Sequence, residues 1–380
     1  MKKLIAMLLA MVMVLGLVAC AAKTEPPAAD TKTETPAAET PAAETPAEET
    51  PAEETPAAEG AVKTDVIATE GKAAELGIPA AVVLQDTTAL EGKKIGSICY
   101  KGDEWCAALA QALEALGAYY GADIVCEDGD LNDETQTKQI ENMISNNVDI
   151  IMVDPITPDG SGIALTNAVE AGIPVIIYDG YWTDGEEKAV TTVTWDQKAT
   201  GTLVGEYFVN YVKENNGGKC RVVELTNAVS THCQERFVGL HEVIDAANAD
   251  GCEIEILNKY DSQGNRETAY NAISAIVEPY DYIISDVDNG AMGAVAALQA
   301  VGNTDVKVFS MGAYGAEPFG KLHDNDVNYQ ACLNVDAWVL AQFIYEGAIS
   351  YFEGKDVPTK TNIDLFVVDG TNVEKFWSFD

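Results

Sequence analysis

The stretch DIIMVDPITPDGSGIALTNAVEAGIPVIIYD, residues 149–179, decides the fold of this chain. It opens with Ile150–Val153, a short apolar run rich in β-branched residues, which predicts a strand buried on both faces. After a segment broken by proline and glycine, apolar residues at three- and four-residue spacing predict a helix over 163–171. A second apolar run, 174–178, ends in Asp179. The stretch therefore predicts one strand–helix–strand unit of a parallel sheet, with a right-handed crossover.

Two aspartates mark the ends of the strands in this unit. Asp154 follows the first strand and Asp179 follows the second. In open parallel sheets, ligands bind outside the carboxyl ends of the strands. Gly180, Tyr181 and Trp182 come next. A carboxylate and two aromatic rings are therefore predicted to lie close together at the end of the second strand, where a ligand could contact them.

The same alternation of strand and helix continues along the chain in both directions. Further strands are predicted over 95–100, 123–127, 190–195, 220–225, 254–260, 282–287, 306–311, 329–333 and 365–368. Further helices are predicted over 69–76, 105–120, 133–146, 199–214, 233–249, 266–277, 290–301 and 336–352. The alternation restarts after about residue 196, which predicts an α/β protein of two doubly wound, parallel-sheet lobes.

Composition limits the classes of function. The chain has 380 residues, enough for two domains, and a formal net charge of −38. Such an acidic surface argues against nucleic acid and anionic membranes as partners. The three His and eight Cys are scattered with no C-x-x-C pair, and the acidic stretch 128–139 lacks the glycine and the final glutamate of a calcium loop. We therefore expect no metal and no cofactor.

The first 60 residues are predicted to lie outside the folded lobes. Lys2 and Lys3 precede a long apolar run, which is typical of a signal peptide or of an uncleaved membrane helix. The tetrapeptide ending in Cys20, Leu-Val-Ala-Cys, resembles the lipobox of bacterial lipoproteins, which implies a signal peptide over 1–20 and acylation of Cys20. Residues 21–60 contain no aromatic residue, and residues 34–59 repeat the pattern Glu-Thr-Pro-Ala, which predicts a disordered, extended stalk over 21–60. We therefore expect a protein outside the cytoplasm, held on the cell membrane by lipid.

Five stretches in order resemble the ribose- and xylose-type periplasmic binding proteins that feed sugar ABC transporters. They are KIGSICYKGDEW, DETQTKQIENMISNNVDIIMVDP, AGIPVIIYD, TWDQKATGTLVGEYF and DNGAMGAVAALQAVG, and the likeness spans about residues 93–370. The resemblance implies two lobes joined by a three-segment hinge, with crossings near Asp196, Asn334 and Asn362. One lobe would comprise 93–195 and 335–361, and the other 196–334 and 362–380. A ligand would lie between lobes that close on it.

A sugar site needs polar side chains for hydroxyls and aromatic plates for C–H faces, in a concave cleft. The candidates from the first lobe are Lys101, Asp103, Glu104, Trp105, Asp179 and Trp182. The candidates from the second lobe are Gln234, Arg236, Asp288, Asn289 and Asn334, with Tyr314 as an addition.

The resemblance gives roles to two of these candidates and leaves the ligand open. It implies that Asp179 accepts hydrogen bonds from sugar hydroxyls and that Trp105 packs on the sugar ring; the alternatives are a turn-capping aspartate and a core tryptophan. Gly180, Val287 and Gly312 stand where pentose binders carry arginine, asparagine and aspartate, so the resemblance supports a sugar-type cleft but no particular sugar.

The sequence thus predicts a lipid-anchored solute-binding protein of an ABC importer, which acts as a monomer and delivers a sugar or sugar-like molecule to a permease. The alternative is a sensor of the same fold that signals to a chemoreceptor or a membrane kinase. We expect no enzymatic activity, because the chain has neither a G-x-S-x-G nor a phosphate-binding loop motif. Seven cysteines remain besides Cys20, and the sequence leaves their pairing open.

Overall fold

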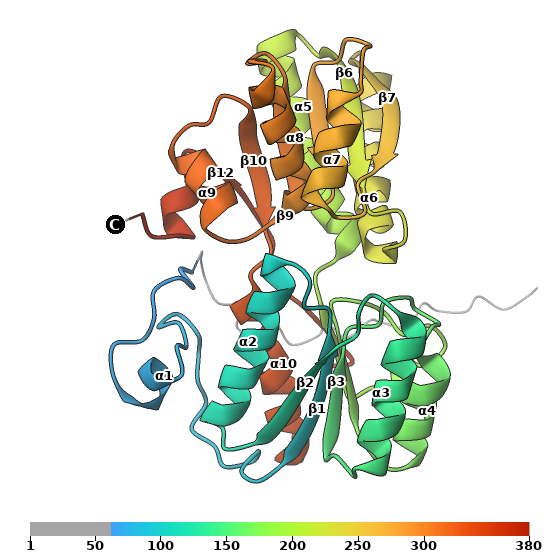
Figure 1. Ribbon diagram of the computed structural model, residues 1–380, viewed down its shortest axis with the longest axis vertical. Helices are drawn as coiled ribbons and strands as arrows, with labels where there is room; N and C mark the ends of the chain where they lie inside the picture. Colours follow the sequence, from blue (N-terminus) through green and yellow to red (C-terminus); the bar gives the residue numbers. More distant parts are fainter. Residues whose placement is uncertain (1–61, 380) are drawn as a thin grey trace, which may run out of the picture. The chain divides into compact units, whose positions relative to one another are not determined.

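Two six-stranded sheets organise the residues that the structure describes (Figure 1). The computed structural model describes residues 62–379. The predicted signal peptide, the lipid attachment at Cys20 and the stalk lie outside these residues. Both sheets belong to one compact unit of the chain. The α/β class with two parallel-sheet lobes is confirmed.

The first sheet is parallel throughout and contains the unit over 149–179. Its strand order is β11-β5-β4-β3-β1-β2. The strands are β1 (Lys94–Cys99), β2 (Asp123–Asp128), β3 (Ile150–Val153), β4 (Val175–Tyr178), β5 (Thr191–Thr194) and β11 (Lys360–Asn362). Every residue of β3 and β4 is buried, because helices cover both faces of the sheet.

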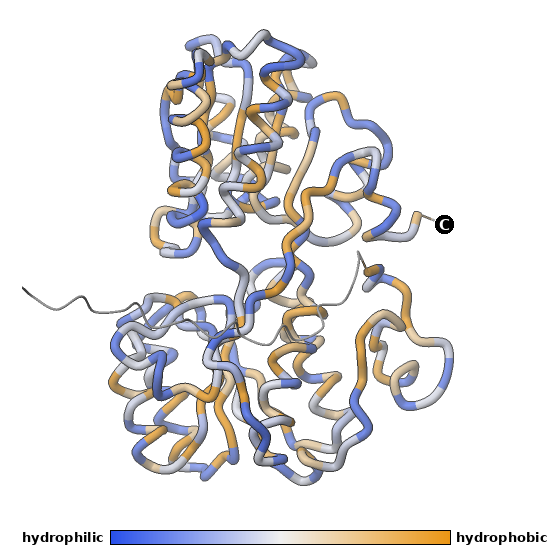
Figure 2. Tube along the Cα trace, turned by 180° about the vertical axis from the view of Figure 1, so that it is seen from behind, coloured by the Kyte–Doolittle hydropathy of each residue, from blue (hydrophilic) through white to orange (hydrophobic). Residues whose placement is uncertain are grey.

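The helices of this first lobe are α2 (Glu104–Tyr119), α3 (Asp133–Ser145), α4 (Gly162–Glu170) and α10 (Ala337–Phe352). Alternate strand residues face opposite helix pairs, as the period of two requires. Met152 of β3 joins the core of α2 and α10, whereas its neighbours Ile151 and Val153 join the core of α3 and α4. Figure 2 shows the apolar strands running through the interior of each lobe.

The second sheet has the order β12-β10-β9-β8-β6-β7, and β12 is antiparallel to β10. Its strands are β6 (Lys219–Thr226), β7 (Glu253–Asp261), β8 (Tyr282–Ser285), β9 (Lys307–Ala313), β10 (Tyr329–Asn334) and β12 (Phe366–Asp369). One face carries α5 (Gln197–Asn216) and α6 (Thr231–Ala249), and the other face carries α7 (Arg266–Ser274), α8 (Asp288–Ala300) and α9 (Ala316–His323).

The chain passes between the two sheets at three places. These are the links from β5 to α5, from β10 to α10 and from β11 to β12. The strand β11 and the helix α9 had no counterpart among the sequence predictions. Both are short, and β11 is only three residues long, so neither produces a periodic apolar pattern long enough to recognise.

The N-terminal segment before β1 reaches the links between the lobes. It contains the short helix α1 (Gly71–Glu75), close to the predicted range 69–76. The hydroxyl of Thr64 donates to Asp336 Oδ2 over 2.6 Å and shares a 3.2 Å hydrogen bond with the hydroxyl of Tyr314. Asp336 caps α10 and Tyr314 belongs to the second lobe, so this segment connects the two lobes next to the links. Among the described residues, no helix is both long and apolar enough to cross a membrane.

Candidate functional site

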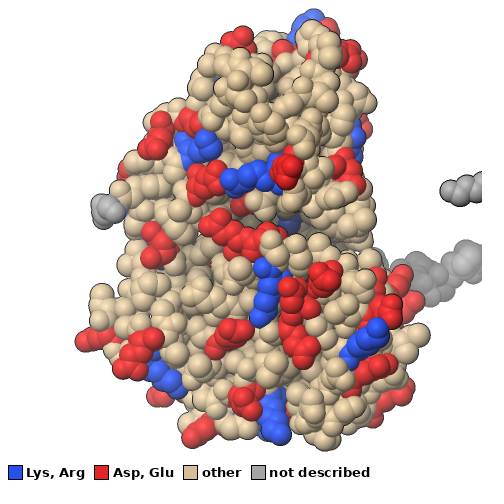
Figure 3. Space-filling view, in the orientation of Figure 1, with Lys and Arg blue, Asp and Glu red and all other residues tan. Residues whose placement is uncertain are grey.

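A cavity of about 480 Å³ lies at the carboxyl ends of the strands, between the two lobes. This volume falls within the range of about 300–1,000 Å³ that is usual for small-molecule sites. Seven of the residues predicted from sequence line the cavity: Asp103, Glu104, Trp105, Asp179, Arg236, Asp288 and Asn289. Figure 3 shows acidic side chains along the hollow between the lobes on this face.

Trp105 is held by the links between the lobes. Asp103 caps α2 by accepting a 2.7 Å hydrogen bond from the backbone of Cys106, which places Trp105 in the first turn of the helix. The indole Nε1 of Trp105 donates to the carbonyl of Val335 over 2.7 Å. Its ring centroid lies 5.9 Å from that of Trp195, and both rings line the cavity. The first lobe thus supplies two aromatic rings whose positions are fixed.

Asp179 has a left-handed backbone conformation, with φ of 55°. Such a conformation is uncommon for residues other than glycine, although aspartate tolerates it, and it turns the chain sharply after β4. The side chain is 7% exposed, and Gln197 Nε2 donates to its Oδ1 over 3.3 Å. Among residues 62–379, the carboxylate therefore lines the cavity with one weak side-chain hydrogen bond.

The second lobe contributes a fixed guanidinium. Arg236, on α6, is 6% exposed. Its Nε donates to Gln197 Oε1 and its Nη1 donates to the carbonyl of Asp286, each over 2.8 Å. These bonds join α6 to the start of α5 and to the end of β8, so the position of Arg236 depends on three elements that meet at the cavity.

Asp288 begins α8 and faces the first lobe. Its Oδ1 accepts from the backbone of Asn289 over 2.8 Å. Burial, and then the neighbouring charge of Asp103, raise the pKa of Asp288 to about 7. The two carboxylates come from opposite lobes, so a ligand that donates to both would relieve their repulsion.

Four predicted residues lie outside the lining of this cavity, for identifiable reasons. Lys101 turns away to the carbonyl of Cys126, over 2.7 Å. Trp182 is 2% exposed and packs in the apolar core between the first sheet and α4. Gln234 donates to Thr226 Oγ1 over 2.7 Å and to a neighbouring carbonyl. Asn334 is 7% exposed at the end of β10.

The additional candidate Tyr314 also lies outside the lining. Its ring makes an edge contact with Trp377, with the centroids 5.7 Å apart. Its hydroxyl is engaged with Thr64, as described above.

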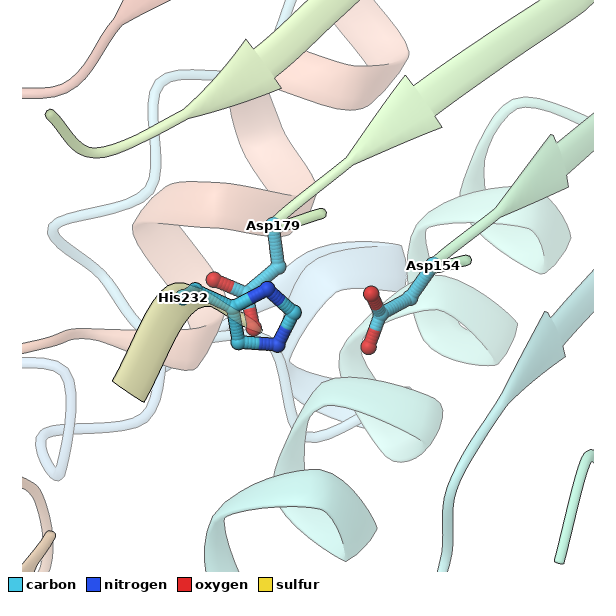
Figure 4. A group of neighbouring side chains, drawn as sticks. All are labelled: Asp154, Asp179 and His232. Atoms are coloured by element: carbon cyan, nitrogen blue, oxygen red, sulfur yellow. The ribbon is translucent and has the colours of Figure 1, made fainter. Parts of the chain in front are cut away.

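Among the lining residues that were absent from the predicted set, Asp154 and His232 lie beside Asp179 (Figure 4). Asp154 directly follows β3 and His232 lies in the first turn of α6. One ligand atom from each of these three residues lies within 4.8 Å of the other two. The strand-end rule that selected Asp179 applies equally to Asp154, whereas nothing in the local sequence marks His232.

The three positions at which this sequence departs from pentose binders, Gly180, Val287 and Gly312, either line the cavity or lie against groups that line it. A Cβ atom at residue 180 would lie 2.8 Å from the carbonyl oxygen of Pro155 and 2.9 Å from Asp154 Oδ1. A Cβ atom at residue 312 would lie 2.8 Å from Arg236 Nη1. Side chains at both glycines therefore conflict with groups that line the cavity, and Val287 lines it without a hydrogen-bonding group.

Two cysteines line the cavity without the character of nucleophiles. Burial raises the pKa of the thiols of Cys106 and Cys233 above the ordinary value. A thiol with a raised pKa stays protonated near neutral pH, and the thiolate is the reactive form. The pair His232–Cys233 consequently gives no support for nucleophilic catalysis.

Comparisons with known proteins agree with this architecture. Residues 96–356 match the periplasmic binding protein domain family. The chain is 28% identical over 319 residues to a putative rhizopine-binding protein of Rhizobium meliloti, covering 79% of this chain and 97% of that protein. It is 26% identical over 235 residues to a galactofuranose-binding protein of Escherichia coli, covering 59% of this chain and 71% of that protein.

Solved structures show the same fold. A solute-binding protein of an ABC transporter from Bacillus halodurans, with bound myo-inositol, superimposes with a TM-score of 0.68 at 22% identity. The superposition covers 75% of this chain and 97% of that protein.

Proposed function

Because the chain belongs to the periplasmic binding protein family, we propose that it captures a sugar or sugar-like molecule between its lobes and delivers it to the permease of an ABC importer. The observation that carries this proposal is the cavity of about 480 Å³, which is lined by hydrogen-bonding side chains from both lobes and by two tryptophans from the first lobe. Polyhydroxylated rings need this combination of donors, acceptors and apolar faces.

The relatives support a ligand of this class. Their names refer to galactofuranose, ribose, rhizopine and D-apiose, and all are binding proteins. We extend this property to the present chain, which captures and releases its ligand without breaking a bond. The predicted lobe boundaries, 93–195 with 335–361 and 196–334 with 362–380, are part of this proposal.

Location follows the same reasoning. Membership of a periplasmic family implies a position outside the cytoplasm. We further propose that Cys20 carries lipid and that residues 21–60 act as a spacer between the membrane and the lobes, because the Glu-Thr-Pro-Ala repeats over 34–59 lie between the lipobox resemblance and the lobes. The binding protein then works as a monomer beside its permease.

Isothermal titration against monosaccharides and polyols tests the proposed binding. We expect at least one ligand with micromolar or tighter affinity. Trp105→Phe should weaken that binding, because the indole faces the cavity and donates to Val335. Trp182→Phe is the matched control, since Trp182 is buried away from the cavity and its change should affect stability alone. Failure of the whole panel to bind, with folded protein, would refute the assignment.

A further inference from the structure

Asp154, Asp179 and His232 form a group that the two lobes share. The two aspartates directly follow β3 and β4 of the first lobe, whereas His232 lies on α6 of the second lobe (Figure 4). All three line the cavity. The group is therefore complete only when the second lobe faces the first.

Asp154 has an oxygen with no hydrogen-bond partner among the described residues. Its Oδ1 is inaccessible to solvent and has no hydrogen bond from any described residue. Gly180 lies against that oxygen, and a side chain at this position would collide with it. A buried carboxylate oxygen without a partner is costly, so a donor is expected to arrive with the ligand.

No basic side chain of the described residues balances the two carboxylates. Neither Asp154 nor Asp179 has a salt bridge within residues 62–379. The nearby Arg236 is bonded to an amide oxygen and to a carbonyl oxygen. Arg266, which also lines the cavity, is paired with Glu317.

His232 does not supply the missing charge either. Burial lowers the pKa of His232 below its ordinary value, with Asp179 opposing that effect. Burial, and then Asp179, raise the pKa of Asp154 well above the usual range. A neutral imidazole offers one lone pair. The two carboxyl groups therefore face each other with no cation between them, and a protonated amine placed there would allow both to be ionised.

From this arrangement we infer that the ligand carries a protonated amine, which lies between Asp154, Asp179 and His232. The ligand would then be an amino sugar or an aminocyclitol rather than a neutral sugar. This inference rests on the proposed function and narrows its substrate class.

The spacing suits an ammonium group. Acceptors placed about 2.8 Å from a tetrahedral ammonium lie about 4.6 Å from one another. Donor atoms around a tetrahedral zinc ion, at about 2.0–2.3 Å, lie nearer to about 3.5 Å apart. The three ligand atoms all lie within 4.8 Å of one another, which leaves room for an ammonium group among them, and the titration below separates an amine from a metal ion.

Titration of matched ligand pairs tests this inference. We would compare glucosamine with glucose, galactosamine with galactose, and scyllo-inosamine with scyllo-inositol, in buffer containing EDTA. N-acetylglucosamine serves as the uncharged derivative. We expect at least one amine to bind tenfold or more tightly than its neutral partner.

Two variants matched for net charge locate the effect. Asp154→Asn keeps the shape of the side chain and should remove at least tenfold of the preference for the amine. Asp159→Asn, at an exposed position in the same loop and outside the cavity lining, should leave the preference unchanged. Circular dichroism of both variants verifies folding.

The remaining outcomes are distinguishable. Equal or tighter binding of the neutral partners would overturn the inference and leave the proposed function intact. Binding of Zn²⁺, Mn²⁺ or Ca²⁺ alone, lost in Asp154→Asn, would overturn it in favour of a metal site. Absence of binding across all pairs would refute the proposed function and, with it, this inference.

Discussion

Replacing Asp336 by asparagine should remove a pH dependence of stability. Asp336 is 5% exposed, and burial raises its pKa to about 6. Its Oδ1 caps α10 by accepting from Trp338 and Val339, and its Oδ2 accepts from Thr64. Asparagine retains an oxygen for the cap, and its amide can donate to the hydroxyl of Thr64. The variant therefore keeps these contacts and loses only the buried charge.

The magnitude follows from linkage. An unfolded aspartate has a pKa of about 3.9, so the folded state holds this proton about 2 pKa units more tightly, equivalent to roughly 3 kcal/mol. Since the pKa of Asp336 is raised in the folded state, its contribution to the free energy of unfolding is fully present below about pH 4 and is lost as the pH rises through about 6. Between pH 5 and pH 8, the wild-type protein should lose about 1.4 kcal/mol through this group, which the variant does not lose.

Urea unfolding followed by tryptophan fluorescence measures this difference. The range should begin at pH 5, because the isoelectric point of the chain is about 4.2. Asp196→Asn is the matched control, since Asp196 caps α5 through the same kind of bond but is exposed. The reasoning fails if the advantage of Asp336→Asn over wild type does not grow from pH 5 to pH 8, or grows equally in the control.

Three further outcomes are expected. Arg236→Met should weaken ligand binding at least tenfold in a titration, because Gln197 and the carbonyl of Asp286 lose the donor that joins them; unchanged affinity would contradict the role of Arg236. Lys101→Ala should leave affinity within twofold, since its ammonium points away from the cavity, and a larger loss would place Lys101 in the site. Mild oxidation should lower the number of free thiols in the wild-type protein by two, as counted by thiol titration, because the sulfurs of Cys99 and Cys126 lie 3.4 Å apart and can form a disulfide. Cys99→Ser should not show this loss, and an equal loss in both proteins would exclude this pair.

The sequence was sufficient for the central strands of both sheets because these strands are continuous apolar runs. Ile150–Val153 and Val175–Tyr178 are buried on both faces. In a chain that alternates strands and helices, a short apolar run of this kind is hard to interpret as anything but a buried strand. Asp179 and Asp288 were found by the same logic, since the end of a strand fixes which side of the sheet a residue occupies.

Side-chain direction within a loop could not be predicted in the same way. Trp182 follows Asp179 by three residues, but the backbone of Asp179 is left-handed, and the indole of Trp182 is buried in the core beside α4 and not in the cavity. Lys101 precedes Asp103 by two residues and finds a carbonyl on β2 instead of the cavity. These orientations depend on contacts that are distant in sequence.

His232 illustrates the same limit from the other lobe. Its position beside Asp154 and Asp179 depends on how α6 faces the first sheet, and no local pattern contains that information. A cavity made by two lobes can thus be located from strand ends, whereas its complete chemistry requires the assembled structure.

The bond from Thr64 to Asp336 has a mechanical consequence. Thr64 is the third described residue, and it is fastened beside the links about which the lobes are expected to swing. Points near an axis of rotation move little when the bodies on either side of it turn. We therefore expect Thr64, where the chain that follows the predicted stalk meets the links, to move little while the lobes open and close. Attachment of the stalk to a membrane would then not oppose the closure of the lobes on a ligand.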